Sequence, residues 1–321
     1  MIRYCDCCSD NRLVKVSLKD VLDNTGTVSS KYDIVTCLDC GNSFLSPMPK
    51  EYEIPSFYSK DYYAHMPNSS KKNSIRAKLK LCLQKAHYGE YSGNKAVKFF
   101  QKIIYHLFRD TINEPPIIVN GKLLDVGCGN GEYLNLARRF GWDVYGVEPN
   151  RNAVFIAKSM GLNVIEGTAD KIEYEKECFD VVKMWNVLEH TVSPRKSLLE
   201  TARVLKKGGY LLLYVPNFDS FEKKYFGKYW NSLEIPRHIH HFSFWSLKHY
   251  LDRTGFRVEK KLYPGTIVST YYPSIKLMKD NGISSFVIIS KSLGWILKKV
   301  CDRLLKRYNK DIGICLLAKK V

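Results

Sequence analysis

A strand that runs directly into a glycine-rich turn constrains the fold of this chain more than any other feature of the sequence. Residues 123–131 read LLDVGCGNG, with three glycines at alternate positions after a largely apolar stretch, and a helical pattern follows over 132–140. Glycine permits the positive φ angles of a tight turn and lets a ligand approach the backbone closely. The segment therefore predicts a strand, a turn and a helix that together bind a cofactor.

The same alternation of strands and helices continues along the chain. Further strands are expected at 144–147, 179–185, 210–215 and 314–318, and helices at 152–160 and 195–205. Such alternation is typical of a parallel sheet with helices on both faces. Pro115 and Pro116 end the preceding pattern, because proline lacks a backbone donor and restricts the residue before it. We therefore predict an α/β core over residues 120–321, with a helical insert at about 271–308.

Two Cys-x-x-Cys pairs near the N-terminus indicate a metal site. The pairs are Cys5 with Cys8 and Cys37 with Cys40, separated by residues that alternate between polar and apolar. Four thiolates complete the tetrahedral shell of structural zinc, and such a closed site leaves no open position for catalysis. We predict a zinc ribbon over residues 1–50. Reduced cysteines without a metal are the alternative, and Cys7 adds a fifth thiol that blurs the first pair.

The chain is strongly basic, with 50 Lys and Arg against 32 Asp and Glu in 321 residues and a formal charge of +18. A field of this sign attracts nucleic acid, anionic lipid or a phosphorylated substrate. The N-terminal residues lack the apolar stretch of a secretory signal, and the most apolar late segment, 283–297, is interrupted by Lys291 and too short to span a bilayer. We expect a cytoplasmic protein, with the basic residues of 298–307 placed to touch an anionic membrane.

Residues 51–119 are expected to form an aromatic and basic helical cap or linker between the ribbon and the core. Tyr58, Tyr62 and Tyr63 are candidates to stack on a sugar ring or to close over a cofactor. Packing between ribbon and core is the alternative for these tyrosines. The run from Lys71 to Arg109 contains a single acidic residue, so it predicts either a solvated helix face or a surface that attracts anions.

Acids at the ends of two predicted strands narrow the choice of cofactor. The turn does not fit the G-x-G-x-x-G dinucleotide fingerprint, because its third glycine comes one residue early and because Asp125 stands just before the turn. A carboxylate there would repel a pyrophosphate but would stabilise an ammonium group. Glu148 ends the next strand, where it is placed to accept hydrogen bonds from both hydroxyls of a ribose. The two acids together favour a nucleoside cofactor with a cationic end.

Short motifs follow one another in the order found in class I S-adenosylmethionine-dependent methyltransferases, which the chain resembles over about 121–265. They are DVGCGNG at 125–131, EP at 148–149, GTAD at 167–170, FDVV at 179–182, VLEH at 187–190 and GG at 208–209. With the cysteine pairs, FLSP at 44–47 and PRH at 236–238, nearly the whole chain resembles zinc-ribbon methyltransferases found among surface-polysaccharide and sugar-modifying enzymes. The resemblance implies a Rossmann-like sheet and S-adenosylmethionine as cofactor.

The resemblance also assigns cofactor contacts residue by residue. The methionine moiety would meet Gly127, Cys128, Gly129 and Gly131, the ribose Glu148 and Pro149, the adenine Thr168, Ala169 and Asp170, and the pocket wall would include Trp185 and Asn186. Thr168 departs from the aspartate that the family often has there, so adenine recognition is expected to depend on Asp170 or on backbone. The alternative for Trp185 is that it is an aromatic core residue with no contact to the cofactor.

Methyl transfer to an alcohol needs a positioned acceptor and a base that removes its proton. Histidine suits that role because it titrates near neutrality. His238, His240 and His241 lie in a predicted substrate segment, 217–245, that leaves the carboxyl end of a strand, where open α/β sheets bind ligands. We expect His241 or His238 to be the base, although an extended chain places 241 on the opposite face from 238 and 240.

Other side chains complete the predicted site. His190 of the VLEH motif is the second candidate base, or else a histidine that steadies the helix starting at Pro194. Glu234 is expected to orient an imidazole, and Arg237 to clamp a phosphate or carboxylate of the substrate. For His238, His240 and His241 the alternative is that they cap a surface loop.

These expectations combine into one predicted activity and several alternatives. We predict O-methylation of a sugar, nucleotide-linked or within a lipid-linked surface glycan, with a histidine base and an anionic acceptor. The alternatives are an RNA base methyltransferase, favoured by the ribbon and the charge of +18, carbon or nitrogen methylation of a sugar or another small molecule, and a non-catalytic scaffold. The histidine segment argues against RNA, and the intact glycine turn argues against the scaffold.

Overall fold

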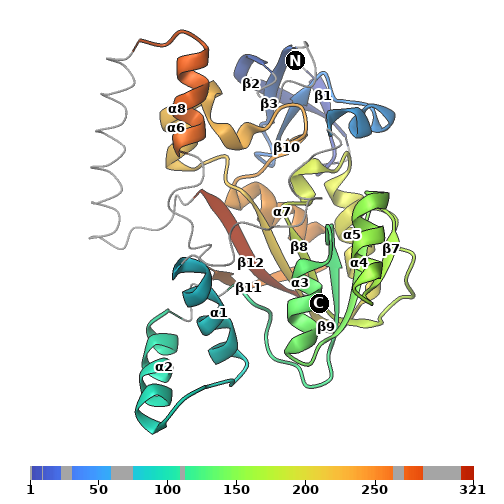
Figure 1. Ribbon diagram of the computed structural model, residues 1–321. Helices are drawn as coiled ribbons and strands as arrows, with labels where there is room; N and C mark the ends of the chain where they lie inside the picture. The colour runs from blue at the N-terminus through green and yellow to red at the C-terminus, as the bar shows by residue number, and fades with distance from the viewer. Residues whose placement is uncertain are drawn as a thin grey trace.

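The computed structural model describes residues 2–8, 10–22, 31–58, 75–108, 113–262, 271–284 and 312–321. Within these ranges the chain forms a seven-stranded sheet, a five-stranded sheet and a helical hairpin, with helices packed on the large sheet (Figure 1). Tyr62, Tyr63, the basic residues of 298–307 and most of the predicted insert lie outside the described residues.

The large sheet is mixed and has the strand order β11-β12-β9-β8-β5-β6-β7. Its strands are β5 (Lys122–Val126), β6 (Asp143–Glu148), β7 (Asn163–Glu166), β8 (Phe179–Trp185), β9 (Leu205–Pro216), β11 (Phe256–Leu262) and β12 (Gly313–Lys320). The strands from β7 to β9 pair in parallel, whereas β12 is antiparallel to both neighbours. Alternation of strands and helices predicts a parallel direction only for strands joined by crossover helices. The sequence therefore did not predict that the terminal strand β12 runs antiparallel to its neighbours.

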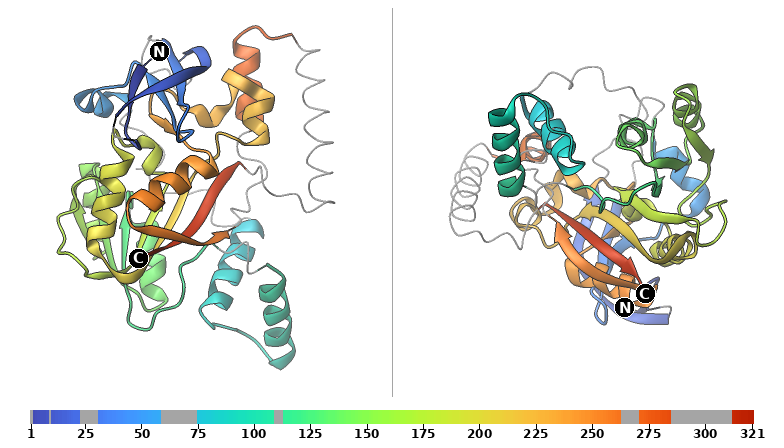
Figure 2. Two further views of the ribbon diagram at one scale, coloured as in Figure 1. Left: turned by 180° about the vertical axis from the view of Figure 1, so that it is seen from behind. Right: turned by 90° about the horizontal axis from the view of Figure 1, so that it is seen from below.

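Helices cover both faces of this sheet, as predicted. They are α3 (Glu132–Arg139), α4 (Arg151–Ser159), α5 (Pro194–Val204) and α7 (Phe244–Arg253). Leu123 of β5 belongs to a buried cluster with side chains of α3 and α4, whereas Leu124 belongs to one with side chains of α5 and α7. Successive residues of a strand point to opposite faces. The helices therefore form two layers around the sheet (Figure 2).

The small sheet takes its last strand from a distant part of the chain. Its strands are β1 (Ile2–Cys5), β2 (Asp10–Leu22), β3 (Lys31–Cys37), β4 (Ser43–Ser46) and β10 (His240–His241), in that order. β10 pairs antiparallel with β4, with His240 opposite Phe44. The sheet that carries the cysteine pairs therefore extends beyond residues 1–50 and includes part of the predicted substrate segment.

A helical hairpin lies at the opposite end of the core from the small sheet (Figure 1). It consists of α1 (Ile75–His87) and α2 (Lys95–Phe108). The remaining helices are η1 (Glu51–Phe57), η4 (Leu188–His190), α6 (Phe221–Phe226), η5 (Gly227–Tyr229), η6 (Asn231–Leu233) and α8 (Tyr271–Asp280). No helix in the described part of the chain is both long and apolar enough to cross a membrane.

The hairpin is attached to the core through aromatic and carboxylate contacts. Tyr88, after α1, stacks on Phe140 with ring centroids 4.4 Å apart, and its hydroxyl oxygen accepts a hydrogen bond from Trp142 at 3.2 Å. Glu114 accepts from Gln84 of α1 at 2.6 Å and from Tyr133 of α3 at 3.0 Å. These contacts involve α1, the residue after it and the segment that follows α2, and none of them involves α2 itself.

Candidate active site

The turn after β5 has the backbone conformation that its glycines predict. Gly127, Gly129 and Gly131 have φ angles of +70°, +54° and +80°. A Cβ atom added at Gly127 would lie 2.5 Å from a methyl of Val187, and one added at Gly131 would lie 2.5 Å from a methyl of Leu162. A larger residue at either position would therefore meet both backbone strain and a steric clash. The turn is closely packed between the segments that follow β8 and precede β7.

Glu148 joins this turn to the end of β6. Its carboxylate accepts hydrogen bonds from the backbone N–H of Gly129 and of Asn150, both at 2.9 Å. Burial raises the pKa of Glu148, and the two backbone donors oppose that rise because they stabilise the charged form. Glu148 therefore organises the glycine turn, and its predicted contact with a ribose stays a prediction.

Asp125 is paired inside the protein with Lys183 of β8. Nζ of Lys183 lies 3.0 Å from Oδ1 of Asp125, both side chains are buried, and the ammonium also lies 4.0 Å from the ring centroid of Tyr133. Burial raises the pKa of Asp125 and the lysine lowers it. The predicted contact of Asp125 with a cofactor ammonium stays a prediction. Sequence reasoning missed Lys183, although a lysine within an apolar strand was a usable signal.

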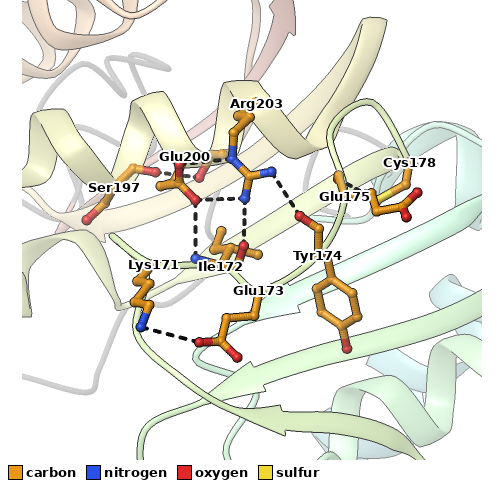
Figure 3. Close-up of polar contacts among 10 residues, drawn as sticks. Lys171, Ile172, Glu173, Tyr174, Glu175, Cys178, Ser197, Glu200 and Arg203 are labelled. Carbon is orange, nitrogen blue, oxygen red and sulfur yellow. Dashed lines mark hydrogen bonds and ion pairs between the residues drawn. The ribbon is translucent and has the colours of Figure 1, made fainter.

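The loop after β7 carries the residues predicted to meet the adenine, 168–170, and α5 holds this loop in place. Arg203 of α5 donates to the carbonyl oxygens of Ile172 at 2.6 Å and Tyr174 at 2.9 Å (Figure 3). Glu200 pairs with Arg203 at 2.8 Å and accepts from the backbone N–H of Ile172 at 3.3 Å. The loop conformation is therefore set by an ion pair on the neighbouring helix.

The other predicted cofactor residues surround the point where the strand order reverses between β5 and β8. Cys128 is buried within the glycine turn, and Pro149 is exposed after β6. Trp185 ends β8 half-buried, its ring stacked on Tyr214 with centroids 4.5 Å apart. Asn186 follows with a φ of +54° and is exposed. Open α/β sheets bind ligands at such a reversal of strand order.

A cluster of Glu189, His190 and His238 lies beyond the carboxyl end of β8, with Glu189 and His238 buried and His190 partly buried. One ligand atom from each residue lies within 4.8 Å of the other two, and the two imidazole centroids are 4.6 Å apart. The loop that carries Glu189 begins at Val187, which faces Gly127. The loop that leads into the cluster thus packs against the glycine turn. Two imidazoles and a carboxylate are also a donor set that transition metals accept.

Backbone carbonyls fix the tautomer of both histidines. Nδ1 of His190 lies 3.1 Å from the carbonyl oxygen of Arg237, and Nδ1 of His238 lies 2.9 Å from that of Ser232. A carbonyl can only accept, so Nδ1 carries the proton in each neutral ring. The hydroxyl oxygen of Tyr58, 2.9 Å from Nδ1 of His190, serves as a second acceptor. In each ring Nε2 keeps its lone pair.

Burial determines the charge of this cluster. It lowers the pKa of His190 and of His238 to about 3, so both rings are neutral at physiological pH. Glu189 is 1% exposed, neither of its carboxylate oxygens has a hydrogen-bond partner among the described residues, and burial raises its pKa well above the usual value. An ionised Glu189 would stabilise an imidazolium, so carboxylate and imidazole can hold one proton between them.

Glu234 and Arg237 border the cluster. Oε2 of Glu234 lies 3.8 Å from Nε2 of His238 and 3.1 Å from a guanidinium nitrogen of Arg237. The structure therefore brings together five predicted site residues, which are Tyr58, His190, Glu234, Arg237 and His238. It adds Glu189, which the sequence analysis quoted in a motif without giving it a role.

His240 and His241 form β10, and neither belongs to this cluster. Nε2 of His240 lies 3.2 Å from the carbonyl oxygen of Val192, and the ring of His241 lies 5.2 Å from that of Phe218 between centroids. Both are buried, and burial lowers the pKa of His241 well below its usual value. The two histidines favoured as base in the sequence, 238 and 241, therefore have different surroundings.

The four predicted metal ligands converge at the start of the small sheet. The sulfurs of Cys5, Cys8, Cys37 and Cys40 all lie within 4.8 Å of one another, and those of Cys5 and Cys40 are 3.6 Å apart. Sulfurs at tetrahedral corners about 2.3 Å from a zinc ion are about 3.8 Å from each other. All four cysteines are buried. The cluster fits a closed structural zinc site.

The first cysteine turn also contacts the core beside the histidine cluster. Asp6, buried between Cys5 and Cys7, accepts hydrogen bonds from the hydroxyl of Ser193 at 2.6 Å and the backbone N–H of Arg195 at 2.8 Å. These groups form the N-terminus of α5, which begins shortly after His190. A carboxylate there satisfies backbone donors and complements the helix dipole. The small sheet therefore positions the loop that carries the cluster.

Comparison with known proteins is consistent with this geometry. A family model described as a methyltransferase domain matches residues 100–261, just over half of the chain. The ubiquinone biosynthesis O-methyltransferase of Maricaulis maris is 34% identical over 185 residues, which cover 54% of this chain and 72% of that protein. An uncharacterized protein of Methanocaldococcus jannaschii is 32% identical over 104 residues, which cover 32% of this chain and 49% of that protein, so the match spans about half of that relative.

A solved structure of a SAM-dependent methyltransferase from Thermotoga maritima is also similar. It shares 20% identity and a TM-score of 0.43, over 64% of this chain and 84% of that one. The family match includes the glycine turn, the strand ends around it and the loop with Glu189 and His190. This chain therefore belongs to the methyltransferase-domain family and is an S-adenosylmethionine-dependent methyltransferase.

Proposed function

We propose that this enzyme methylates a hydroxyl group of a sugar, with a histidine of the buried cluster as general base. The observation that carries the proposal is the group of Glu189, His190 and His238 next to the glycine turn. An alcohol oxygen must lose its proton as it attacks a methyl group. S-adenosylmethionine, when bound, supplies that methyl group on a sulfonium. A neutral imidazole with a fixed tautomer presents Nε2 to accept the proton.

The geometry favours His190 or His238 as the base over His241. The first two share the cluster with Glu189, whereas His241 lies beside Phe218 in β10. A base of pKa about 3 is weak on its own, so the partnership with Glu189 is essential to the proposal. Only the ionised form of Glu189 would stabilise the imidazolium as it forms and raise its effective basicity, and burial, which raises the pKa of Glu189, opposes that ionisation.

Support for an oxygen acceptor and for a sugar comes from separate observations. The Maricaulis maris relative is named an O-methyltransferase, and the arrangement of cysteine pairs before the methyltransferase core resembles sugar-modifying enzymes. Tyr58 contacts His190 with ring centroids 6.1 Å apart and offers an aromatic face near the cluster. Aromatic faces suit the apolar side of a sugar ring. Arg237 stays the proposed contact for an anionic group on the acceptor.

RNA is the second candidate substrate, because the chain carries a formal charge of +18 and the hairpin is basic. Phosphate-backbone binding would show a steep loss of affinity with salt. Methyl transfer to a small sugar would not need that dependence. Carbon or nitrogen methylation would change the requirement for a base. An amine acceptor needs a weaker base, and a carbon acceptor needs a stabilised carbanion.

The test is methyl transfer from labelled S-adenosylmethionine to two acceptor pools taken from the source cells. One pool holds nucleotide-linked and lipid-linked glycans, and the other holds unmodified total RNA. Label in the glycan pool that disappears with His190→Ala or His238→Ala supports the proposal. Label confined to RNA would overturn the proposal. Label on a carbon or nitrogen in the glycan pool would overturn the assignment of oxygen as the methylated atom.

A further inference from the structure

Helix α2 exposes an apolar surface that no other described segment covers. Phe99 and Phe100 are 62% and 63% exposed, Val97 is 44% exposed and Ile103 is 39% exposed. At about 100° of rotation per residue these four side chains occupy an arc of about 160° on one side of the helix. Single exposed apolar residues are ordinary on protein surfaces, but a continuous apolar patch marks an interaction site.

The side of α2 that contacts α1 and the loop between the helices lies next to the apolar arc, beyond Val97. Gln101 accepts a hydrogen bond from the backbone N–H of Ser92 at 3.1 Å, and the Tyr105 hydroxyl lies 3.3 Å from Nδ1 of His87. Gln101 and Tyr105 are half-buried, and so is Ile104, which lies within the arc between Phe100 and Val97. A helix in a soluble hairpin normally turns its apolar side inward. Here Val97, Phe99, Phe100 and Ile103 remain exposed, so most of the arc is left open to solvent.

Lysines border this arc. Lys95, Lys98 and Lys102 project from the side of α2 next to Phe99, and all three are exposed. Over residues 75–108 the sequence has seven Lys and Arg and one Glu. Lysine side chains can extend their charged ends toward lipid headgroups while their stems lie along apolar surface. An apolar arc flanked by lysines is the pattern of helices that lie in the interface of an anionic bilayer.

We propose that α2 binds an anionic membrane surface, with Phe99 and Phe100 inserted among the acyl chains and the lysines at the headgroups. The place of α2 in the fold is consistent with this, because it lies at the edge of the molecule with α1 between it and the core (Figures 1 and 2). A second copy of the chain is a poorer occupant, because it would bring two sets of lysines together. RNA is also poorer, because it offers nothing to cover a continuous apolar arc.

The proposal is independent of the methylated substrate and is tested with the full chain. Co-sedimentation is measured with vesicles of phosphatidylcholine alone and of phosphatidylcholine mixed with an equal amount of phosphatidylglycerol. We expect at least about tenfold stronger binding to the anionic vesicles. The double substitution F99S/F100S should lower that binding at least about tenfold, and replacement of the three lysines by Gln should remove the preference for anionic lipid.

Phe155→Ser is the matched control, because Phe155 is 76% exposed on α4, away from the hairpin. It should leave vesicle binding unchanged, and unfolding curves should show that all variants fold. Equal vesicle binding by the wild type and F99S/F100S would overturn the proposal. So would a loss of self-association or of RNA binding in the hairpin variants without a loss of vesicle binding, since that result would assign the surface to a second copy or to RNA.

Discussion

The small sheet and the helical hairpin are both additions to one methyltransferase core, yet they are attached in different ways. The small sheet shares β10 with the segment that carries His238, and its Asp6 binds the N-terminus of α5. The hairpin contacts the core through Tyr88, which stacks on Phe140, and the segment after the hairpin does so through Glu114, which accepts a hydrogen bond from Tyr133 of α3. An addition that supplies a strand and a helix-capping carboxylate to the loops of the site becomes part of its scaffold, whereas one that leaves a helix outside these contacts is free to present a docking surface.

Removal of metal from the four-cysteine cluster tests the difference between the two additions with the largest expected effect. Chelation, or Cys37→Ser, should unfold the small sheet, since four buried thiolates without an ion leave little to hold the two cysteine turns together. Methyl transfer should then fall below detection. Metal analysis, circular dichroism and activity measured on one sample check this. Full activity of the metal-free protein would show that the sheet does not support the site.

Substitution within the histidine cluster should act on chemistry alone. His190→Ala or His238→Ala is expected to lower the transfer rate about a hundredfold for the residue that acts as base. Binding of S-adenosylmethionine, measured by calorimetry, should be unchanged, because neither histidine is among the residues predicted to contact the cofactor. His241→Ala is the comparison within the same segment, and an equal loss there would contradict the assignment to the cluster.

Acid should destabilise the protein through the same histidines. Their pKa in the folded chain, about 3, lies below the usual 6.5, so as pH falls below 6.5 the unfolded chain binds protons that the folded chain excludes. Each histidine should cost about 2 kcal/mol of stability by pH 5. Urea unfolding at pH 7 and pH 5 measures this, and the loss should shrink in His238→Phe. Hairpin substitutions should leave the dependence on pH unchanged.

Asp6→Ala isolates the link between the small sheet and α5. Loss of two hydrogen bonds at a helix N-terminus should lower the free energy of unfolding by about 1 to 2 kcal/mol. Glu173→Ala is the control, because its ion pair with Lys171 is exposed (Figure 3) and contributes little. Denaturant unfolding compares the two. Equal effects would mean that the carboxylate of Asp6 does not couple the two regions.

The smallest effect is expected in the hairpin. F99S/F100S should change the free energy of unfolding by less than about 0.5 kcal/mol, since both rings are exposed and pack on little. Transfer to a water-soluble acceptor should stay within about twofold of the wild type. A large loss of stability would show that the apolar arc is covered within the protein, and the contrast between the two additions would then disappear.

The sequence predicted features that depend on local pattern. The glycine turn, the cysteine pairs and the strand at 179–185 are encoded by neighbouring residues, and the structure confirms each of them. The pairing of β10 with β4, which places His240 and His241 in the small sheet, is not reported by any local pattern. Lys183 and Glu189 were missed for a related reason, because the role of a buried charge depends on what the fold places beside it.

The pairing of β10 with β4 also has a consequence for the order of folding during synthesis. Asn42 and His240 are in contact across 198 positions of sequence. The small sheet can thus gain its last strand only after most of the core has left the ribosome, and contacts of such long range form slowly. The small sheet, most of which is made before the core, is therefore completed only after most of the core, and until then its cysteines are held by a partly formed sheet.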